Sequence, residues 1–201
     1  MRRDAPPHHA SVIFLGRWVS GMTHQLRYYE AVEQLQLGRR LQQWNWQLSG
    51  SPPLGIEIDD AEIDVVCSFA EPAIFAETVW NEFGAAGEFR IWQRTTKERP
   101  VVARFRAFGW EVEIYGSSVP LRQQLAVRHY EIEKRLLCLG GDRLRSSVRR
   151  MKQSGIKTER AFAMILNLTG DPYEALLRLE DVSDSQLAEL FAGAGLAGDS
   201  H

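Results

Sequence analysis

Residues 61–68 (AEIDVVCS) alternate acidic and apolar side chains, and this pattern constrains the fold more than any other stretch of the chain. In a β-strand, side chains two positions apart lie on the same face of the sheet. Glu62 and Asp64 then project together, while Ile63 and Val65 face a core. Because the residues after Asp64 are apolar on both faces, the pattern predicts a central strand whose acids are costly unless they are ligated or paired.

A second stretch, residues 108–116 (FGWEVEIYG), alternates in the same way and supplies a further carboxylate. Glu111 and Glu113 lie on one face of the expected strand, opposite Val112 and Ile114. Glu113 is the preferred third acid because apolar residues flank it on both sides, and Glu111 is the runner-up.

Carboxylates from two neighbouring strands are typical of a site for a divalent cation. Mg²⁺ takes carboxylate, phosphate and water oxygens at about 2.1 Å, and Mn²⁺ accepts similar ligands. We therefore predict Glu62, Asp64 and Glu113 as metal ligands and catalytic residues, with Glu113 also accepting the proton of an acceptor hydroxyl.

A Gly-Ser turn, Gly50-Ser51, precedes the acidic strand by about ten residues, and Pro52-Pro53 follows it as the expected first turn of a short helix. Backbone N–H groups of such a turn, together with the Ser51 hydroxyl, are suited to holding nucleotide phosphates. An ordinary strand-ending turn is the alternative. The spacing to Glu62 and Asp64 favours the phosphate-binding role for Gly50 and Ser51.

This constellation resembles the nucleotidyltransferase superfamily with a DNA polymerase β-type core. Its pattern is a Gly-Ser turn, then hDh[DE]h, then h[DE]h on a later strand, and the matching elements are Gly50-Ser51, Glu62-Ile63-Asp64 and Glu113. Two departures are Glu62 where Asp is usual and Ala61 where Ser is usual. With these two departures, an altered metal geometry or a loss of catalysis remains an alternative.

Over nearly the whole chain, the sequence is similar to a narrower bacterial family, domain of unknown function family 4269. The resemblance lies in residues 21–35, 50–67, 112–133 and 155–177. It implies an α+β fold with a nucleotidyltransferase-like mixed sheet and packed helices, followed by a C-terminal helical half.

Three residues outside the acidic strands are candidates for nucleotide binding. Gln124 and Arg128 lie on the helix that follows the Glu113 strand, where amide and guanidinium groups can reach phosphate. Lys157 precedes a helix and can neutralise a triphosphate. For Gln124 and Arg128, a polar network that clamps the helix to the sheet is an equal alternative, and a lone helical histidine such as His129 is more often structural than catalytic.

The spacing of apolar residues and of Gly and Pro predicts the elements of secondary structure. Helices are expected over 22–36 (ended by Gly38), 71–83, 120–138, 142–153, 158–167 (with Thr158 as N-cap), 172–178 and 183–193, and strands over 41–49, 61–68, 89–94, 101–105 and 110–115. The sheet half spans 12–118 and the helical half 119–194, with flexible ends over 1–10 and 195–201.

Composition excludes several classes of protein. The 201 residues are 44% hydrophobic, which is enough for a core, and the two cysteines have no metal-site spacing. No apolar run approaches the roughly 20 residues of a membrane span, so we expect a soluble, cytoplasmic protein with no membrane partner. A net charge of −2 weighs against nucleic acid as a partner without excluding it. One cluster of basic residues is most simply interpreted as a solvated helix face, and it is the only place where a tRNA-like partner can dock. Its members are Arg143, Arg145, Arg149, Arg150 and Lys152.

The sequence therefore favours a metal-dependent nucleotidyltransferase that uses Mg²⁺ or Mn²⁺ and moves a nucleoside monophosphate from a nucleoside triphosphate to an acceptor the sequence does not name. Two alternatives remain at this point. One is a catalytically degenerate module that binds a nucleotide or a protein, and the other is a nucleotide hydrolase that uses the same carboxylates on water.

Overall fold

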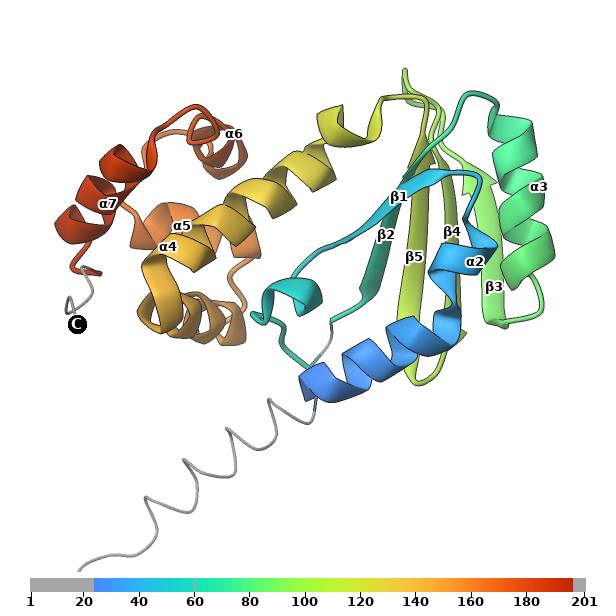
Figure 1. Ribbon diagram of the computed structural model, residues 1–201, viewed down its shortest axis with the longest axis horizontal. Coiled ribbons are helices and arrows are strands. Elements are labelled where there is room, and N and C mark those ends of the chain that lie inside the picture. Colours follow the sequence, from blue (N-terminus) through green and yellow to red (C-terminus); the bar gives the residue numbers. More distant parts are fainter. Residues whose placement is uncertain (1–23, 60, 197–201) are drawn as a thin grey trace, which may run out of the picture.

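The computed structural model describes residues 24–59 and 61–196 and contains a five-stranded mixed sheet (Figure 1). Its strands lie in the order β1-β2-β5-β4-β3. Only β2 and β5 run parallel among these pairs. The strands are β1 (Asn45–Ser49), β2 (Ile63–Ser68), β3 (Gly87–Gln93), β4 (Val101–Ala107) and β5 (Trp110–Ser117). The predicted α+β class is confirmed.

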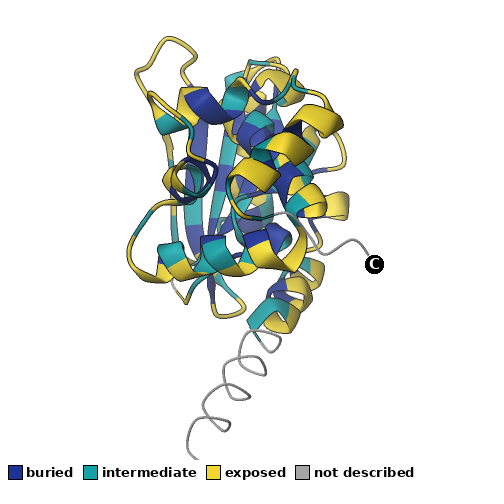
Figure 2. Ribbon diagram, turned by 90° about the vertical axis from the view of Figure 1, so that its left-hand side faces the viewer, coloured by how far each residue is buried: buried dark blue, intermediate teal, exposed yellow. Residues whose placement is uncertain are grey.

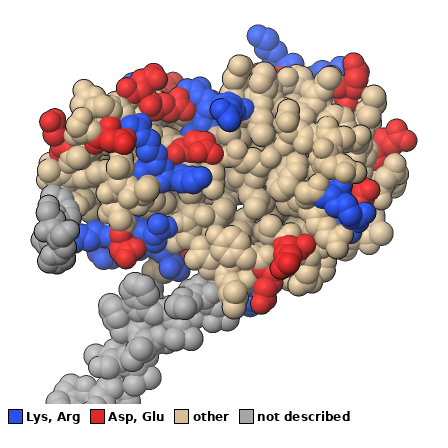
Figure 3. Space-filling view, viewed as in Figure 1, with Lys and Arg blue, Asp and Glu red and all other residues tan. Residues whose placement is uncertain are grey.

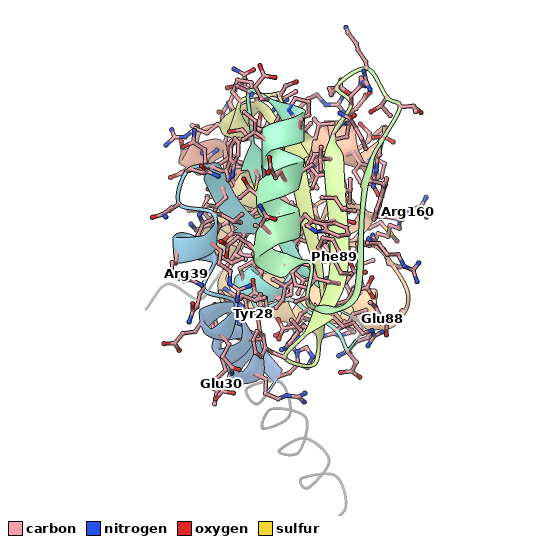
Figure 4. All side chains as sticks on the ribbon, turned by 90° about the vertical axis from the view of Figure 1, so that its right-hand side faces the viewer. Tyr28, Glu30, Arg39, Glu88, Phe89 and Arg160 are labelled. Atoms are coloured by element: carbon pink, nitrogen blue, oxygen red, sulfur yellow. The ribbon has the colours of Figure 1, made fainter. Side chains whose placement is uncertain are left out.

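Helices near the N-terminus cover one face of the sheet. They are the helix over 24–35, α2 (Leu37–Arg40) and α3 (Pro72–Phe83). Their apolar side chains form one core with the inward residues of the strands, and Figure 4 shows Phe89 of β3 next to α3, where it meets Trp80 edge to face. Gly116 of β5 is needed here, because a Cβ at this position would lie 2.2 Å from Phe75.

The rest of the chain is helical and forms a second core of its own. Its elements are the 3₁₀ turn η2 (Leu121–Gln123), α4 (Leu125–Gln153), α5 (Thr158–Ile165), α6 (Pro172–Leu177) and α7 (Asp184–Gly193). Leu54 and Ile56 join this core from the segment that begins with the 3₁₀ turn η1 (Pro52–Leu54). Figure 2 shows buried residues in the strands and on inward helix faces, with exposed residues on the outer turns. The loop after β1 thus ties the sheet to the helices.

Several boundaries differ from the sequence prediction. The first helix ends because Gln36 adopts a left-handed conformation (φ 50°), and Gly38 lies inside α2 rather than ending the helix. The first strand consequently starts at Asn45 instead of residue 41. Thr158 is the first helical residue of α5, and Lys157 takes the N-cap position.

The predicted break between two long helices is a kink rather than a loop. α4 continues from Leu125 to Gln153, and only Gly141 (φ 59°, ψ −155°) leaves helical geometry. Apolar residues before and after the kink lie in the same core, which explains why the helix resumes at once. The expected flexible end over 1–10, the first two residues of the predicted helix (22–23) and most of the tail over 195–201 lie outside the described residues.

A candidate nucleotide and metal site

A cavity of about 680 Å³ lies between the sheet and the helical half. Its walls come from β1, β2 and β5 on one side and from the start of α4 and of α5 on the other. The volume falls in the range of small-molecule and cofactor sites. Of the predicted site residues, it brings together Gly50, Ser51, Asp64, Glu113 and Gln124.

Asp64 and Glu113 face each other across the parallel pair β2 and β5. The strand register places them directly opposite, so both side chains project from the same face of the sheet. Burial, followed by the charges of Glu113 and Glu62, raises the pKa of Asp64 to about 7. A cation bound beside Asp64 would offset the burial and the neighbouring negative charges, and would therefore favour the ionised form of its carboxyl group.

Glu62 lies one residue before β2 and does not line the cavity. Burial raises its pKa, while the Arg104 guanidinium opposes that effect. Glu62 therefore interacts electrostatically with Asp64 and Glu113, although it does not line the cavity that they line.

The Gly-Ser turn lies against Asp64. Gly50 has φ +76°, and a Cβ added to it would lie 2.3 Å from Asp64 Oδ2. Only glycine combines that backbone conformation with so close an approach. Ser51 then precedes η1 and lines both the main cavity and a neighbouring groove of about 340 Å³.

Within residues 24–59 and 61–196, no three His, Cys, Asp or Glu side chains are grouped closely enough to hold a metal ion by themselves. Glu113 is turned toward Arg104, whose Nε and Nη2 both lie 2.7 Å from Glu113 Oε2. Mg²⁺ is usually held by one or two carboxylates together with substrate phosphates. The donor set of Asp64 and Glu113 fits that mode of binding, in which the nucleotide completes the site.

The other predicted nucleotide ligands are dispersed. Gln124 donates from Nε2 to the carbonyls of Cys67 and Val119, which clamps α4 to the sheet and leaves its buried Oε1 without a partner in the described chain. Arg128 forms an ion pair with Glu180 and does not line the cavity. Lys157 is exposed and lines the groove beside Ser51.

Two buried polar side chains on α4 also line the cavity. His129 is 8% exposed, its Nδ1 has no partner in the described chain, and burial lowers its pKa. Glu133 is 4% exposed, and burial, reinforced by Glu159, raises its pKa to about 8. Sequence reasoning missed Glu133, although it falls on the buried stripe of α4 between Ile132 and Leu136.

Lys152 corrects the interpretation of the basic cluster as a solvated face. Its side chain is 6% exposed, and burial lowers its pKa to about 8 against the opposing effects of Glu133 and Glu57. It lines the groove that Ser51 shares with the main cavity. Arg145, another member of the cluster, donates from Nη1 to the Leu54 carbonyl and so holds η1 against α4.

On the face shown in Figure 3, charges of both signs are interspersed. Figure 3 shows Lys and Arg side chains over the helical half, with Asp and Glu side chains among them. The described residues on this face form no continuous basic area of the kind that binds a nucleic-acid backbone.

Glu133→Gln is expected to flatten the pH dependence of stability. The folded state keeps the Glu133 proton up to a pKa of about 8, whereas an unfolded glutamate releases it near its ordinary value of 4.5. The folded state therefore binds more protons between these values, and the free energy of unfolding falls as the pH rises. We expect the variant to remove a loss of about 3–4 kcal/mol between about pH 5 and pH 8, measured by urea denaturation.

Glu189→Gln, an exposed change on α7, is the control and should leave the slope unchanged. In the wild type, the lowered pKa of Lys152 makes stability rise with pH only between about 8 and its ordinary value of 10.5, above the range compared here. An unchanged slope in Glu133→Gln would show that this carboxyl is ionised in the folded protein at neutral pH.

Comparison with known proteins gives a family and a fold. A sequence model described as "Domain of unknown function (DUF4269)" matches residues 30–179. No curated protein matches the chain in sequence. The structure is similar to the poly(U) polymerase Cid1 bound to MgGTP, with a TM-score of 0.55, 17% identity, and coverage of 77% of this chain and 48% of that chain.

A cytoplasmic RNA terminal U-transferase is also similar, with a TM-score of 0.52, 15% identity, and coverage of 74% of this chain and 42% of that chain. The chain spans about half the length of these solved structures. At such identities the likeness shows the fold alone, and it confirms the predicted nucleotidyltransferase-like architecture. No helix within 24–59 and 61–196 has the length and apolar character to cross a bilayer.

Proposed function

Because the chain belongs to the DUF4269 family and has a nucleotidyltransferase fold, we propose that it is a metal-dependent nucleotidyltransferase. It would move a nucleoside monophosphate from a nucleoside triphosphate to an acceptor hydroxyl. The observation that carries the proposal is the pairing of Asp64 with Glu113 in a cavity beside the glycine of a Gly-Ser turn. Similarity to a polymerase structure that holds MgGTP adds support.

The protein's own groups would bind and orient the triphosphate. The turn at Gly50 and the Ser51 hydroxyl would offer hydrogen-bond donors to the phosphates on one side. The Lys152 ammonium would offer them a positive charge from the neighbouring groove, which Ser51 lines together with the main cavity. Asp64 and Glu113 would hold Mg²⁺ or Mn²⁺, which supplies charge neutralisation at the phosphoryl oxygens.

Glu113 would accept the proton of the acceptor hydroxyl at a lone pair of Oε1, the other lone pair of that oxygen being directed to the cation. The Arg104 ion pair occupies Glu113 Oε2, so Oε1 lies outside that pair. Holding a carboxylate in one orientation beside the acceptor lets proximity and electrostatics carry most of the catalysis.

Lys152→Met is expected to weaken triphosphate binding about 10–100-fold, since a hydrogen bond to a charged group contributes about 1.5–3 kcal/mol. The methionine fills a similar volume in the buried position, so the fold should be retained. Isothermal titration of ATP in the presence of Mg²⁺ measures the change.

Arg150→Met on the same helix is the matched control, because it removes one exposed positive charge. Equal weakening in both variants would assign the effect to net charge and would contradict a phosphate contact by Lys152.

Titration of each of the four ribonucleoside triphosphates with and without Mg²⁺ tests the proposed function. We expect binding that requires the metal and that Asp64→Asn abolishes. Metal-independent binding, or none, would instead support the catalytically degenerate module. Pyrophosphate or phosphate release without any acceptor, followed by chromatography of the nucleotide products, would identify a hydrolase.

A further inference from the structure

One row of polar side chains crosses four strands at the level of the site. The register pairs Ser49 with Asp64 and Asp64 with Glu113. It then pairs Glu113 with Arg104 of β4. Since directly paired residues project from the same face, Arg104 stands beside Glu113 on the side away from Asp64.

Arg104 holds a single oxygen of Glu113. Its Nε donates to Oε2 at 2.7 Å and its Nη2 lies 2.7 Å from the same atom, while Nη1 reaches Glu111 Oε1 at 3.5 Å. The Glu113 side chain is 17% exposed, so this fork acts on a largely buried carboxylate. Charge-assisted contacts of this length fix orientation as well as charge.

The guanidinium approaches from outside the cavity. Arg104 does not line the space that Asp64 and Glu113 line, but lies in a separate hollow with Trp92 of β3 and Glu111. It therefore supports Glu113 from behind instead of occupying the place of a bound cation.

We propose that Arg104 is a positioning residue that fixes Glu113 as a one-oxygen ligand for the divalent cation. The inference rests on the proposed function. With Oε2 held by Arg104, Glu113 cannot turn both oxygens to a cation, and its Oε1 is kept on the Asp64 side of the row. Partners that orient a metal ligand in this way typically change metal affinity 10–100-fold when they are removed.

Mn²⁺ binding to the metal-free full chain, titrated to millimolar Mn²⁺ because only two carboxylates hold the ion before a nucleotide adds its phosphates, tests the proposal without turnover. A wild type that binds no Mn²⁺ in this range would overturn the inference and leave the proposed function to the nucleotide titrations. The electron paramagnetic resonance signal of free Mn²⁺ gives the Kd directly. We expect Arg104→Met to bind Mn²⁺ about 10–100-fold more weakly than the wild type. Arg104→Lys keeps the charge and lacks the fork, so it should be weakened as well.

Arg106→Met is the matched control. Arg106 lies two residues along the same strand, pairs with Glu88 at 3.5 Å and is 62% exposed, so its loss removes an equal charge without touching Glu113. We expect its Mn²⁺ affinity to equal that of the wild type.

Unchanged or tighter Mn²⁺ binding in Arg104→Met would overturn the inference. Wild-type affinity in Arg104→Lys would also overturn it, because it would show that the positive charge at this position suffices and that orientation of Glu113 does not matter. Both outcomes leave the proposed function intact if the wild type binds Mn²⁺ and Asp64→Asn does not. If Asp64→Asn binds Mn²⁺ as the wild type does, the proposed function fails, and the inference fails with it.

Discussion

Asp64→Asn is expected to reduce nucleotidyl transfer about 10³-fold, because a carboxylate that holds a divalent cation carries several kcal/mol of transition-state stabilisation. The substitution keeps the shape of the side chain and removes its charge. Release of pyrophosphate in the presence of a triphosphate, Mg²⁺ and a pool of candidate acceptors measures the loss.

The same substitution should not lower stability in metal-free buffer. Burial and the neighbouring acids raise the pKa of Asp64 from 3.8 to about 7, so the folded state holds its proton in a range where the unfolded state has released it. The unfolding free energy therefore falls as pH rises through this range. A neutral amide removes that loss, and at about pH 8 we expect the Tm of the variant to equal or exceed that of the wild type.

Glu111→Gln is the informative comparison for this experiment. Glu111 lies two residues before Glu113 on the same face of β5, is 37% exposed, and does not line the cavity. We expect it to keep most of the transfer activity. Full activity in Asp64→Asn would end the catalytic assignment, and a loss in Glu111→Gln as large as in Glu113→Gln would show that the third acid had been chosen wrongly.

The sequence predicts which side chains share a face of each strand, but it does not predict which strands are neighbours. Alternation alone places Glu62 with Asp64, and Glu111 with Glu113. The meeting of Asp64 with Glu113 depends on β2 pairing with β5, whose segments are about fifty residues apart in sequence. The resemblance to a known superfamily supplied that pairing in advance, since its third acid lies on a later strand.

Residues that act through tertiary contacts were beyond the sequence pattern. Arg104 alternates with Ala103 and Phe105 as an outward residue of β4, and nothing local indicates that it meets Glu113. Lys152 lies among arginines at the end of a long helix, so its burial near Glu57 and Glu133 has no local signal. Glu133 had one, because it interrupts the apolar stripe of α4.

Turn residues, too, were predictable only where the sequence carries a local signal. Gly50 was recognisable because Gly-Ser precedes the acids at a defined spacing, and its left-handed conformation fits that role. The end of the first helix was predicted to within one residue, but the residue that ends it was not, because glycine is the usual residue after a helix and here Gln36 adopts the left-handed conformation. A residue other than glycine is uncommon in that region of the backbone, and propensity alone does not identify this one.

Gly50→Ala is expected to lower transfer activity about 10²-fold, through displacement of Asp64 and not through loss of the fold. The new Cβ would lie 2.3 Å from Asp64 Oδ2, so the carboxylate must move by roughly 1 Å to restore van der Waals contact. A shift of that size in a catalytic group typically costs about 10²-fold in rate. The left-handed backbone (φ +76°) adds a stability cost of about 1–2 kcal/mol, measurable by urea denaturation.

Gly109→Ala separates backbone strain from the clash. Gly109 has φ +82° in the exposed turn between β4 and β5, and among the described residues a Cβ there would have one neighbour within 4 Å, Arg27 Nη2 at an ordinary 3.7 Å. We expect a similar loss of stability in this variant with transfer activity near that of the wild type. If both variants lost activity in proportion to their stability, the close contact of Gly50 with Asp64 would have no catalytic consequence. If Gly50→Ala alone lost both activity and Asp64-dependent Mn²⁺ binding, the glycine would be required because its missing side chain leaves room for the carboxylate that holds the cation.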